Sequence, residues 1–272
     1  MLLKPFLKWA GGKRQLLHEI QKLIPYSINT YYEPFIGAGA IFFNFQPNRA
    51  VINDLNSELM NVYQVIKDNL DSLLNDLPKH ENSKEYFYHI RSLDREPGYL
   101  NMSAVERASR IIYLNKTCFN GLFRVNSKGY FNVPFGYYKN PKIIEAMLLR
   151  SVHEYLNTAH ITILNTDFED AVHEAKKGDF VYFDPPYDPV SDTSSFTSYN
   201  LDGFNKNEQK RLKSVIDDLT AKECKVLLSN SGTEFIKKLY QGYHIKTVYA
   251  NRAINSVASK RGSVDEVLVM NY

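Results

Sequence analysis

Residues 180–187, F-V-Y-F-D-P-P-Y, constrain the possible folds of this chain more than any other stretch. The four apolar and aromatic residues predict a buried strand, and Asp184 stands where that strand should end. Pro185 and Pro186 cannot continue the hydrogen-bonded ladder and fix the direction of the backbone. The carboxylate of Asp184 and the ring of Tyr187 are therefore expected at the rim of a sheet, which is where open α/β sheets bind ligands.

The groups at this turn suit a flat base that carries an exocyclic amine. Asp184 and the carbonyl of Pro185 can accept the two amine hydrogens, while the ring of Tyr187 can stack on the base. The alternative is a strand that simply stops at an Asp-Pro turn. That alternative accounts for one proline but not for Pro186 or Tyr187.

Composition indicates a globular protein that is not strongly charged. The chain has 272 residues, is 44% hydrophobic and carries a net charge of +3, so any case for nucleic-acid binding depends on where the charges lie. Cys118 and Cys224 match no metal or disulfide pattern and indicate reduced thiols in a cytoplasmic protein. The sequence has no stretch of eighteen apolar residues, so neither a membrane span nor a membrane partner is expected.

A second motif combines a strand, a glycine turn and a helix. Residues 30–35 predict a short aromatic strand, and Gly37 and Gly39 then allow a ligand to approach the backbone before an apolar helix at 41–45. By itself a G-x-G indicates a binding loop only weakly. Residues 51–52 predict another strand that ends in Asn53-Asp54. Asp54 can hold a ribose there, or it can cap the next helix, and its place after the second strand favours ribose.

The N-terminal residues 6–13, F-L-K-W-A-G-G-K, resemble a phosphate loop only superficially. Such a loop requires Ser or Thr after the lysine, and this chain has Arg14 after Lys13. A lysine at a glycine turn before a predicted helix still suits an anionic group of a ligand.

Residues 107–142 are the basic part of the chain. They contain seven lysines or arginines, eight aromatic residues and no acidic residue, which is typical of surfaces that follow phosphates and stack on bases. Residues 122–125 and 130–133 flank N-S-K-G and predict a β-hairpin that could enter a DNA groove. A solvated hairpin with an aromatic core is the competing interpretation.

The remaining chain predicts further α/β units. A helix is expected from Pro141, and a strand at 161–164 leads into Asp167 and Phe168. Residues 188–203 predict a mobile lid. The later expectations are a helix capped by Asn205 and Glu208, a strand at 226–229 stopped by Asn230, strands at 244–250 and 267–270, and a flexible loop with Arg252, Lys260 and Arg261.

Together these motifs resemble the Dam-type DNA adenine-N6 methyltransferases of the alpha group. The resemblance rests on K-W-x-G-G-K, E-P-F-x-G-x-G, N-D-x-N, F-N-G-L-x-R and D-P-P-Y in this order, and it covers nearly the whole chain. It implies an α/β fold with a Rossmann-like, seven-stranded mixed sheet at residues 1–56 and 160–272. Residues 57–159 would form an inserted, mainly helical target-recognition domain with a β-hairpin. The implied activity is methyl transfer from S-adenosyl-L-methionine to adenine N6 in double-stranded DNA, within 5′-GATC-3′, by base flipping and in-line transfer.

The resemblance assigns roles to individual positions. The flipped adenine would be held by Asp184, Pro185, Pro186 and Tyr187. The cofactor would be held by Trp9, Ala10, Gly11, Lys13, Pro34, Phe35, Gly37, Gly39, Asp54, Asp167, Phe168 and Asp184. DNA would contact Lys8, Lys116, Phe119 as a wedge, Asn120, Leu122, Arg124, Asn126, Asn132, Pro134, Tyr138 and Lys139. Tyr137 stands where close relatives often carry Arg. No metal is expected, and the implied protein is a cytoplasmic monomer that could be virus-encoded.

Rival activities differ in how far the sequence excludes them. Cytosine-C5 methylation needs a cysteine nucleophile, and neither Cys118 nor Cys224 stands near the D-P-P-Y turn. Methylation of cytosine N4, RNA or a glutamine amide would use a similar turn, and only the recognition hairpin argues against these substrates. A DNA-binding protein without enzymatic activity is a further alternative, which the intact Asp184 disfavours.

Overall fold

The computed structural model describes residues 3–9, 13, 16–189, 204–251 and 263–272. These residues group into two compact units. The first consists of Met1–Gly12, Ile36–Asn48 and Asn53–Thr166, and the second of Lys13–Phe35, Arg49–Ile52 and Asp167–Tyr272. The predicted division into catalytic and recognition domains stays a prediction. None of the helices in the described part of the chain is both long and apolar enough to span a membrane.

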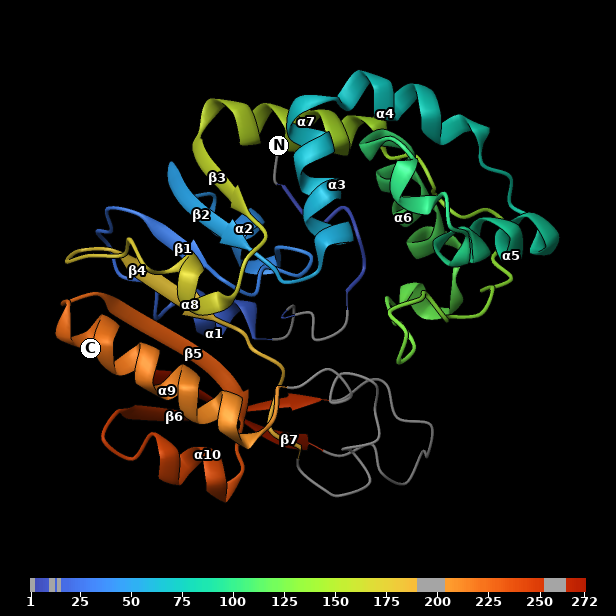
Figure 1. Ribbon diagram of the computed structural model, residues 1–272. Coiled ribbons are helices and arrows are strands. Elements are labelled where there is room, and N and C mark those ends of the chain that lie inside the picture. Colours follow the sequence, from blue (N-terminus) through green and yellow to red (C-terminus); the bar gives the residue numbers. More distant parts are fainter. Residues whose placement is uncertain (1–2, 10–12, 14–15, 190–203, 252–262) are drawn as a thin grey trace. The chain divides into compact units, whose positions relative to one another are not determined.

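Seven strands form one mixed sheet in the order β3-β2-β1-β4-β5-β7-β6 (Figure 1). Their bounds are β1 Tyr31–Glu33, β2 Arg49–Asn53, β3 His160–Leu164, β4 Phe180–Phe183, β5 Lys225–Ser231, β6 His244–Asn251 and β7 Ser263–Met270. The predicted α/β class with a seven-stranded mixed sheet is confirmed.

Parallel pairing fixes where the D-P-P-Y turn begins. β4 pairs in parallel with β1 on one side and β5 on the other, and β1 also pairs in parallel with β2. The carboxyl ends of these strands therefore meet at one edge of the sheet, where Asp184 follows β4 directly. All four residues of β4 are fully buried, as expected for a central strand with both faces covered.

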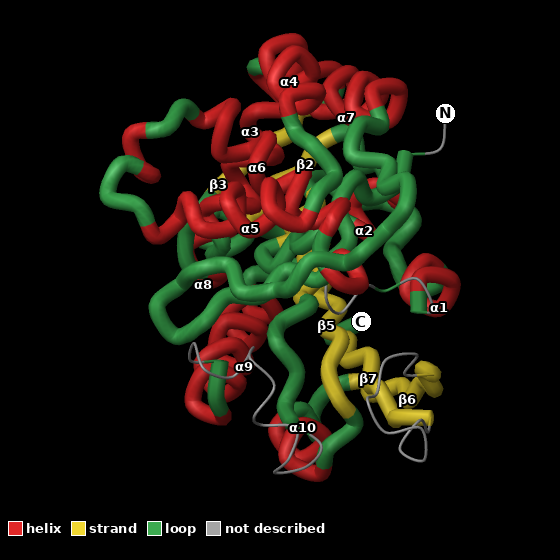
Figure 2. The backbone as a smooth tube through the Cα atoms, turned by 90° about the vertical axis from the view of Figure 1, so that its right-hand side faces the viewer, coloured by secondary structure: helices red, strands yellow, loops and turns green. Residues whose placement is uncertain are grey.

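The far end of the sheet is antiparallel. β5 pairs with β7, and β7 pairs with β6, which lies beside it in Figure 2. The predicted strand at 226–229 is too short, because β5 continues through Asn230 to Ser231. Both extra residues are fully buried and pair with β7. Asn230 therefore does not terminate the strand as its propensity suggested.

The helices of the first unit include and flank residues 107–142, the recognition segment. They are α2 Ala40–Phe45, α3 Ser57–Asp68, α4 Leu70–Asp76, α5 Lys84–Ser92, α6 Ala104–Thr117 and α7 Ala146–Thr158, with the 3-10 turns η1 Leu77–Lys79, η2 Leu93–Arg95, η3 Tyr99–Asn101 and η4 Phe119–Gly121. α6 begins with a capping box in which Ser103 and Glu106 satisfy each other's backbone N–H groups. α3 packs against α6 and α7.

Two predictions for this unit are corrected. The helix expected from Pro141 begins only at Ala146. Before it the N–H of Ile143 donates to the carbonyl of Pro141 in a turn, and Ile143 packs against the apolar core of the recognition segment. The expected hairpin has the right turn but no regular strands. It has an isolated bridge between Val125 and Phe131, and the side chain of Asn126 accepts the backbone N–H groups of Lys128 and Tyr130.

The second unit carries the remaining helices. They are α1 Leu17–Gln21, α8 Phe168–Ala171, α9 Lys206–Ala221 and α10 Glu234–Leu239. Asn205 caps α9 by accepting the N–H groups of Asn207 and Glu208, so this predicted helix start is confirmed. α9 packs on β5. Leu212 and Ile216 join Val181 and Phe183 in the apolar core of this unit.

A buried arginine organises the recognition segment. Arg110 on α6 is 2% exposed, and its guanidinium binds Asp94 Oδ2 at 2.9 Å and the carbonyls of Ile90 and Arg91. Asp94 Oδ2 also accepts the backbone N–H of Phe131 at 2.7 Å. This ion pair therefore ties two helical segments to the chain that follows the hairpin turn.

Replacing Arg110 with Ala should lower the free energy of unfolding by about 3–5 kcal/mol. Asp94 would keep only the more exposed Arg95 as its cation, and the carbonyls of Ile90 and Arg91 would each lose a donor. Chemical denaturation followed by circular dichroism measures this change.

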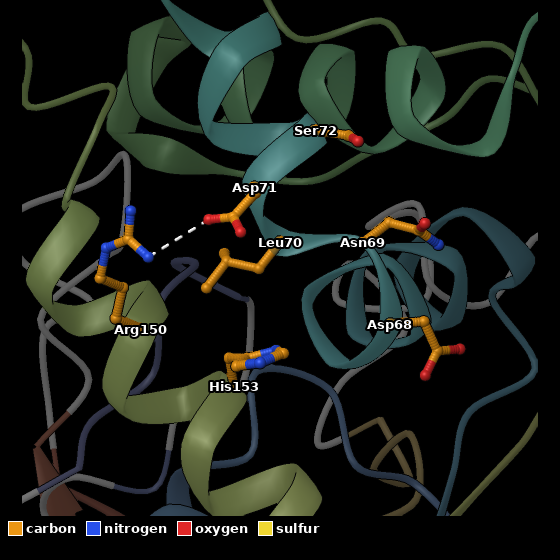
Figure 3. A pocket seen from close by; sticks show the side chains of 7 residues that line it. All are labelled: Asp68, Asn69, Leu70, Asp71, Ser72, Arg150 and His153. Carbon is orange, nitrogen blue, oxygen red and sulfur yellow. Dashed lines mark hydrogen bonds and ion pairs between the residues drawn. The ribbon is translucent and has the colours of Figure 1, made fainter.

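Arg150 supplies the matched control. It pairs with Asp71 at 3.3 Å beside a surface pocket of about 300 Å³ (Figure 3). Both side chains are mostly exposed, so Arg150→Ala should leave stability unchanged. Equal effects of the two substitutions would contradict the structural role given to Arg110.

Candidate active site

The carboxylate of Asp184 is held from two sides within the second unit. Lys13 Nζ lies 2.8 Å from Asp184 Oδ1, and Ser229 Oγ on β5 donates to the same oxygen at 3.0 Å. Lys13 is buried, and the Asp184 side chain is 19% exposed. The sequence predicted a role for both charged groups but not their direct contact.

Tyr187 is held at its hydroxyl and over one face of its ring. Its hydroxyl donates to Glu266 Oε2 on β7 at 2.9 Å, and Lys13 Nζ lies over the ring, 4.6 Å from its centroid. The cation and the carboxylate acceptor leave little freedom to the ring. Glu266 was not found from the sequence, because nothing in a C-terminal strand marks one glutamate as the partner of a distant tyrosine.

Burial and charge oppose each other in this cluster. Burial raises the pKa of Asp184, while Lys13 and Ser229 act to lower it. For Lys13 burial acts to lower the pKa, but Asp184, Tyr182 and Glu266 together outweigh it, so the pKa of Lys13 is raised. Lys13 is therefore a firmly charged cation in a buried site, where electrostatic effects on a neighbouring group are strong.

The glycine turn after β1 is preformed within the first unit. Gly37 has φ +49°, and a Cβ at this position would lie 3.1 Å from Trp9. Its N–H donates to Asp54 Oδ2 at 3.0 Å, and its carbonyl accepts from Tyr63. Gly39, the residue before α2, also adopts a positive φ. The backbone turn and Asp54 thus form one rigid group.

Asp54 does not cap the next helix, which was one of the two roles that the sequence left open for it. The cap of α3 is Asn56, whose side chain accepts the N–H of Leu59, while Asp54 accepts the N–H groups of Gly37 and Asn56. Burial raises the pKa of Asp54, and these two hydrogen bonds oppose the shift. Asp54 therefore braces the glycine turn, and its binding to ribose stays a prediction.

Asp167 and Phe168 lie together with an arginine that the sequence did not single out. Asp167 caps α8, and Arg211 on α9 binds both its carboxylate oxygens at 2.7 and 2.8 Å. These bonds lower the pKa of Asp167. The guanidinium also lies 4.1 Å from the centroid of the Phe168 ring. The ring of Phe35 packs on the ring of Phe168, with 5.4 Å between the two centroids. Pro34, which precedes Phe35 in the sequence, is buried.

Lys8 and Trp9 are docked on the recognition segment of the first unit. The side-chain amide of Asn115 on α6 accepts the N–H of Lys8 at 2.9 Å and donates to its carbonyl at 2.7 Å. Lys8 Nζ lies over the ring of Tyr138, and Trp9 stacks on Phe123 at 4.6 Å. Trp9 thus touches both the glycine turn and the hairpin.

The predicted DNA contacts differ in their surroundings. Arg124 is exposed, and its Nε donates to Asn132 Oδ1 at 2.6 Å, so two predicted contacts touch each other. Lys116 is half-buried and pairs with Glu145 at 2.9 Å. The other predicted contacts at this surface are the exposed Phe119, Asn120, Pro134 and Lys139 and the half-buried Leu122, Asn126 and Tyr138. Tyr137 is also exposed and packs on Phe135.

Some predicted residues lie outside the part of the chain that the structure describes. These are Ala10 and Gly11, the segment 190–203 of the expected lid, and Arg252, Lys260 and Arg261. Within the described residues, no three His, Cys, Asp or Glu side chains gather closely enough to hold a metal ion. Burial raises the pKa of Cys118 to about 12, which suits an unreactive thiol.

Comparison with known proteins identifies the family. A family model of the D12 class N6 adenine-specific DNA methyltransferases matches residues 9–254. The chain belongs to this family. The predicted resemblance and enzyme class are thereby confirmed, and the methyltransferase acts on adenine in DNA.

Relatives match the methyltransferase over nearly its full length. The type II methyltransferase M1.LlaDCHI of Lactococcus lactis subsp. cremoris is 52% identical over 272 residues, covering 99% of this chain and 96% of the relative. M.MjaIII of Methanocaldococcus jannaschii, also a type II methyltransferase, is 42% identical and both chains are covered completely. A DNA adenine methylase of Haemophilus influenzae is 34% identical, covering 98% of this chain and 93% of the relative. The expectations of a cytoplasmic monomer without a metal stay predictions.

Gly121 gives the methyltransferase room for Lys8. It adopts φ +62°, and a Cβ there would overlap the Lys8 side chain, whose own Cβ would lie 3.0 Å away. Gly121→Ala should therefore displace Lys8 and also lower stability by roughly 1–2 kcal/mol through backbone strain. Thermal denaturation and fluorescence anisotropy with duplex DNA measure the two effects.

Gly129→Ala is the control for strain alone, because Gly129 has φ +78° but a methyl group at this position would have nothing within 4 Å. Stability should fall further in Gly121→Ala than in Gly129→Ala. An equal loss of stability in both variants would show that the contact with Lys8 does not contribute to stability.

Proposed function

We propose that this methyltransferase transfers a methyl group from S-adenosyl-L-methionine to N6 of a flipped adenine in duplex DNA. The observation that carries the proposal is the group formed by Lys13, Asp184 and Tyr187 at the carboxyl end of β4. It combines an oriented carboxylate, a fixed aromatic ring and a buried cation. The carboxylate and the ring are the groups that a planar base with an exocyclic amine requires, and the cation holds both of them in place.

The chemistry of adenine explains why such a turn is needed. The N6 lone pair is delocalised into the ring, so the amine is a weak nucleophile. Asp184 and the carbonyl of Pro185 accept its two hydrogens, which fixes the amine and opposes the delocalisation. Tyr187 stacks on the base, and Pro186 keeps the turn rigid. Because these groups act by alignment and electrostatics, no covalent enzyme intermediate is required.

The residues assigned to the cofactor fit its chemistry in their local settings. Lys13 is a charged cation that suits the carboxylate at the methionine end of the cofactor. Gly37 and Gly39 form the turn assigned to the same end, and Trp9 lies against Gly37. Asp54, held by two backbone N–H groups, offers a carboxylate for the ribose diol. Asp167, with Phe35 and Phe168, offers an acceptor and rings for the adenine. S-adenosyl-L-methionine supplies a methyl group that its sulfonium already activates.

Recognition of duplex DNA is assigned to the surface around the hairpin turn. We propose 5′-GATC-3′ as the target, read by Lys8, Leu122, Arg124, Pro134 and Tyr138. Phe119 is 52% exposed, which suits an aromatic wedge that fills the stack when the adenine leaves it. Asn126, Asn132 and Lys139 are assigned to the phosphate backbone. Asn120 and Lys116 are assigned to the same DNA-binding surface, where Lys116 pairs with Glu145.

Asp184→Ala should keep affinity for duplex DNA and lose nearly all methyl transfer, because the acceptor for the amine is removed. Transfer of a tritiated methyl group to an oligonucleotide with one GATC site, combined with DNA-binding measurements, tests this expectation.

The matched control is Asp170→Ala, which removes an exposed carboxylate on α8 and should retain full activity. Turnover of Asp184→Ala close to that of the control would remove the proposed role of Asp184. Mapping the modified base in the wild-type product separates adenine N6 from cytosine N4.

Arg124→Ala should relax discrimination at one base pair by roughly 1–3 kcal/mol, because an arginine fork reads a guanine edge. The measurement compares kcat/KM on GATC duplexes with that on duplexes altered at each position. Lys139→Ala, at an assigned phosphate contact, should instead weaken all duplexes alike. Uniform weakening by Arg124→Ala would reassign Arg124 to the backbone.

A further inference from the structure

The carboxyl end of β5 carries three consecutive polar residues that are fully buried, Ser229, Asn230 and Ser231. Polar groups in the middle of a sheet lower stability unless each finds a partner. Their neighbours Leu227 and Leu228 on the same strand are apolar core residues. Packing alone therefore does not explain these three buried polar residues.

Each of these residues bonds to the chain around the D-P-P-Y turn. Ser229 Oγ donates to Asp184 Oδ1 at 3.0 Å. Asn230 Oδ1 accepts the backbone N–H of Asp188 at 3.1 Å, and Ser231 Oγ donates to the Asp188 carbonyl at 2.7 Å. The run thus reaches both ends of the segment 184–188.

Gln209 on α9 completes the contacts. It is 1% exposed, and its Nε2 donates to the carbonyl of Pro186 at 2.9 Å. Its Oε1 accepts from Asn230 Nδ2 at 3.0 Å. One pair of buried amides therefore holds the backbone of the turn at Pro186 and at Asp188.

The hydrogen bonds at Ser229 have a definite direction. Asp184 as a carboxylate only accepts, so the single proton of Ser229 goes to it. Tyr182 OH lies 3.0 Å from Ser229 Oγ and must then be the donor of that bond. Burial raises the pKa of Tyr182 well above its ordinary value, so this hydroxyl keeps its proton.

We propose that Ser229, oriented by Tyr182, is a positioning residue for Asp184, and that the Asn230–Gln209 pair fixes the backbone of the same turn. Ser229 and Lys13 both bind Oδ1, and within the described residues no donor reaches Oδ2. This arrangement stops rotation of the carboxylate and presents Oδ2 to the amine. The inference rests on the proposed role of Asp184, and it goes further by naming the groups that set the angle of the carboxylate.

Ser229→Ala should lower kcat by about tenfold to a hundredfold, the range expected for a misplacement near 1 Å. Affinities for duplex DNA and S-adenosyl-L-methionine should change less than threefold. The acid limb of the kcat profile should also move to higher pH. Ser229 is one of the groups that lower the pKa of Asp184, so its loss raises that pKa further.

Lys13, Tyr182, Tyr187 and Glu266 are the other titratable groups around this carboxylate, and all of them remain in the variant. Thr220→Val is the matched control. It removes a partly buried hydroxyl that binds Asn271 near the amino end of β5. A purely structural effect would lower the thermal midpoint of both variants and leave the pH profile in place.

Ser229→Thr, which keeps the hydroxyl, should recover most of the lost kcat. If Ser229→Ala does not fold, Tyr182→Phe decides, because it removes only the group that orients Ser229 and should still lower kcat and shift the acid limb. Wild-type kcat and an unshifted acid limb in the folded variant would overturn the inference while leaving the function intact. Failure of the proposed function itself has a separate signature, an active Asp184→Ala or a wild type without adenine methylation.

Discussion

The parallel hydrogen bonding of β4 between β1 and β5 is the constraint on which the candidate active site depends. It places the carboxyl end of this fully buried central strand beside the carboxyl ends of its neighbours. The two prolines that follow cannot continue the pairing, so the chain leaves the sheet there. Asp184 therefore takes its position from main-chain pairing rather than from a loop. β5 gains a second function from the same pairing, because its own carboxyl end lies next to the turn and can bond to it.

The sequence predicted the features that depend on residues close together in the chain. The hydrophobic run at 180–183 predicts β4, and the glycine at position 37 predicts a turn because glycine tolerates a positive φ. The side chain of Asn205 predicts the start of α9. Interactions between distant residues could not be predicted. Nothing near Arg211 in the sequence indicates Asp167 as its partner, and nothing near Glu266 indicates Tyr187.

The wrong predictions have the same origin. Asn230 was expected to end a strand because asparagine is rare in strands, but bonds to Gln209 and Asp188 satisfy its side chain and let the strand continue. Pro141 was expected to start a helix, but no helix forms before Ala146, and Ile143 packs against an apolar core. In both places tertiary contacts outweigh local propensity.

The clamp between Asn115 and Lys8 has a consequence for the evolution of sequence preference. One amide side chain pairs with both backbone groups of Lys8, as an adjacent strand would. The start of the chain is thereby a structural part of the recognition segment, although more than one hundred positions separate it from Asn115. Under the proposed assignment of DNA recognition to this surface, changes at residues 3–9 would alter which DNA is chosen, and a swap of recognition segments between relatives would have to carry these residues along.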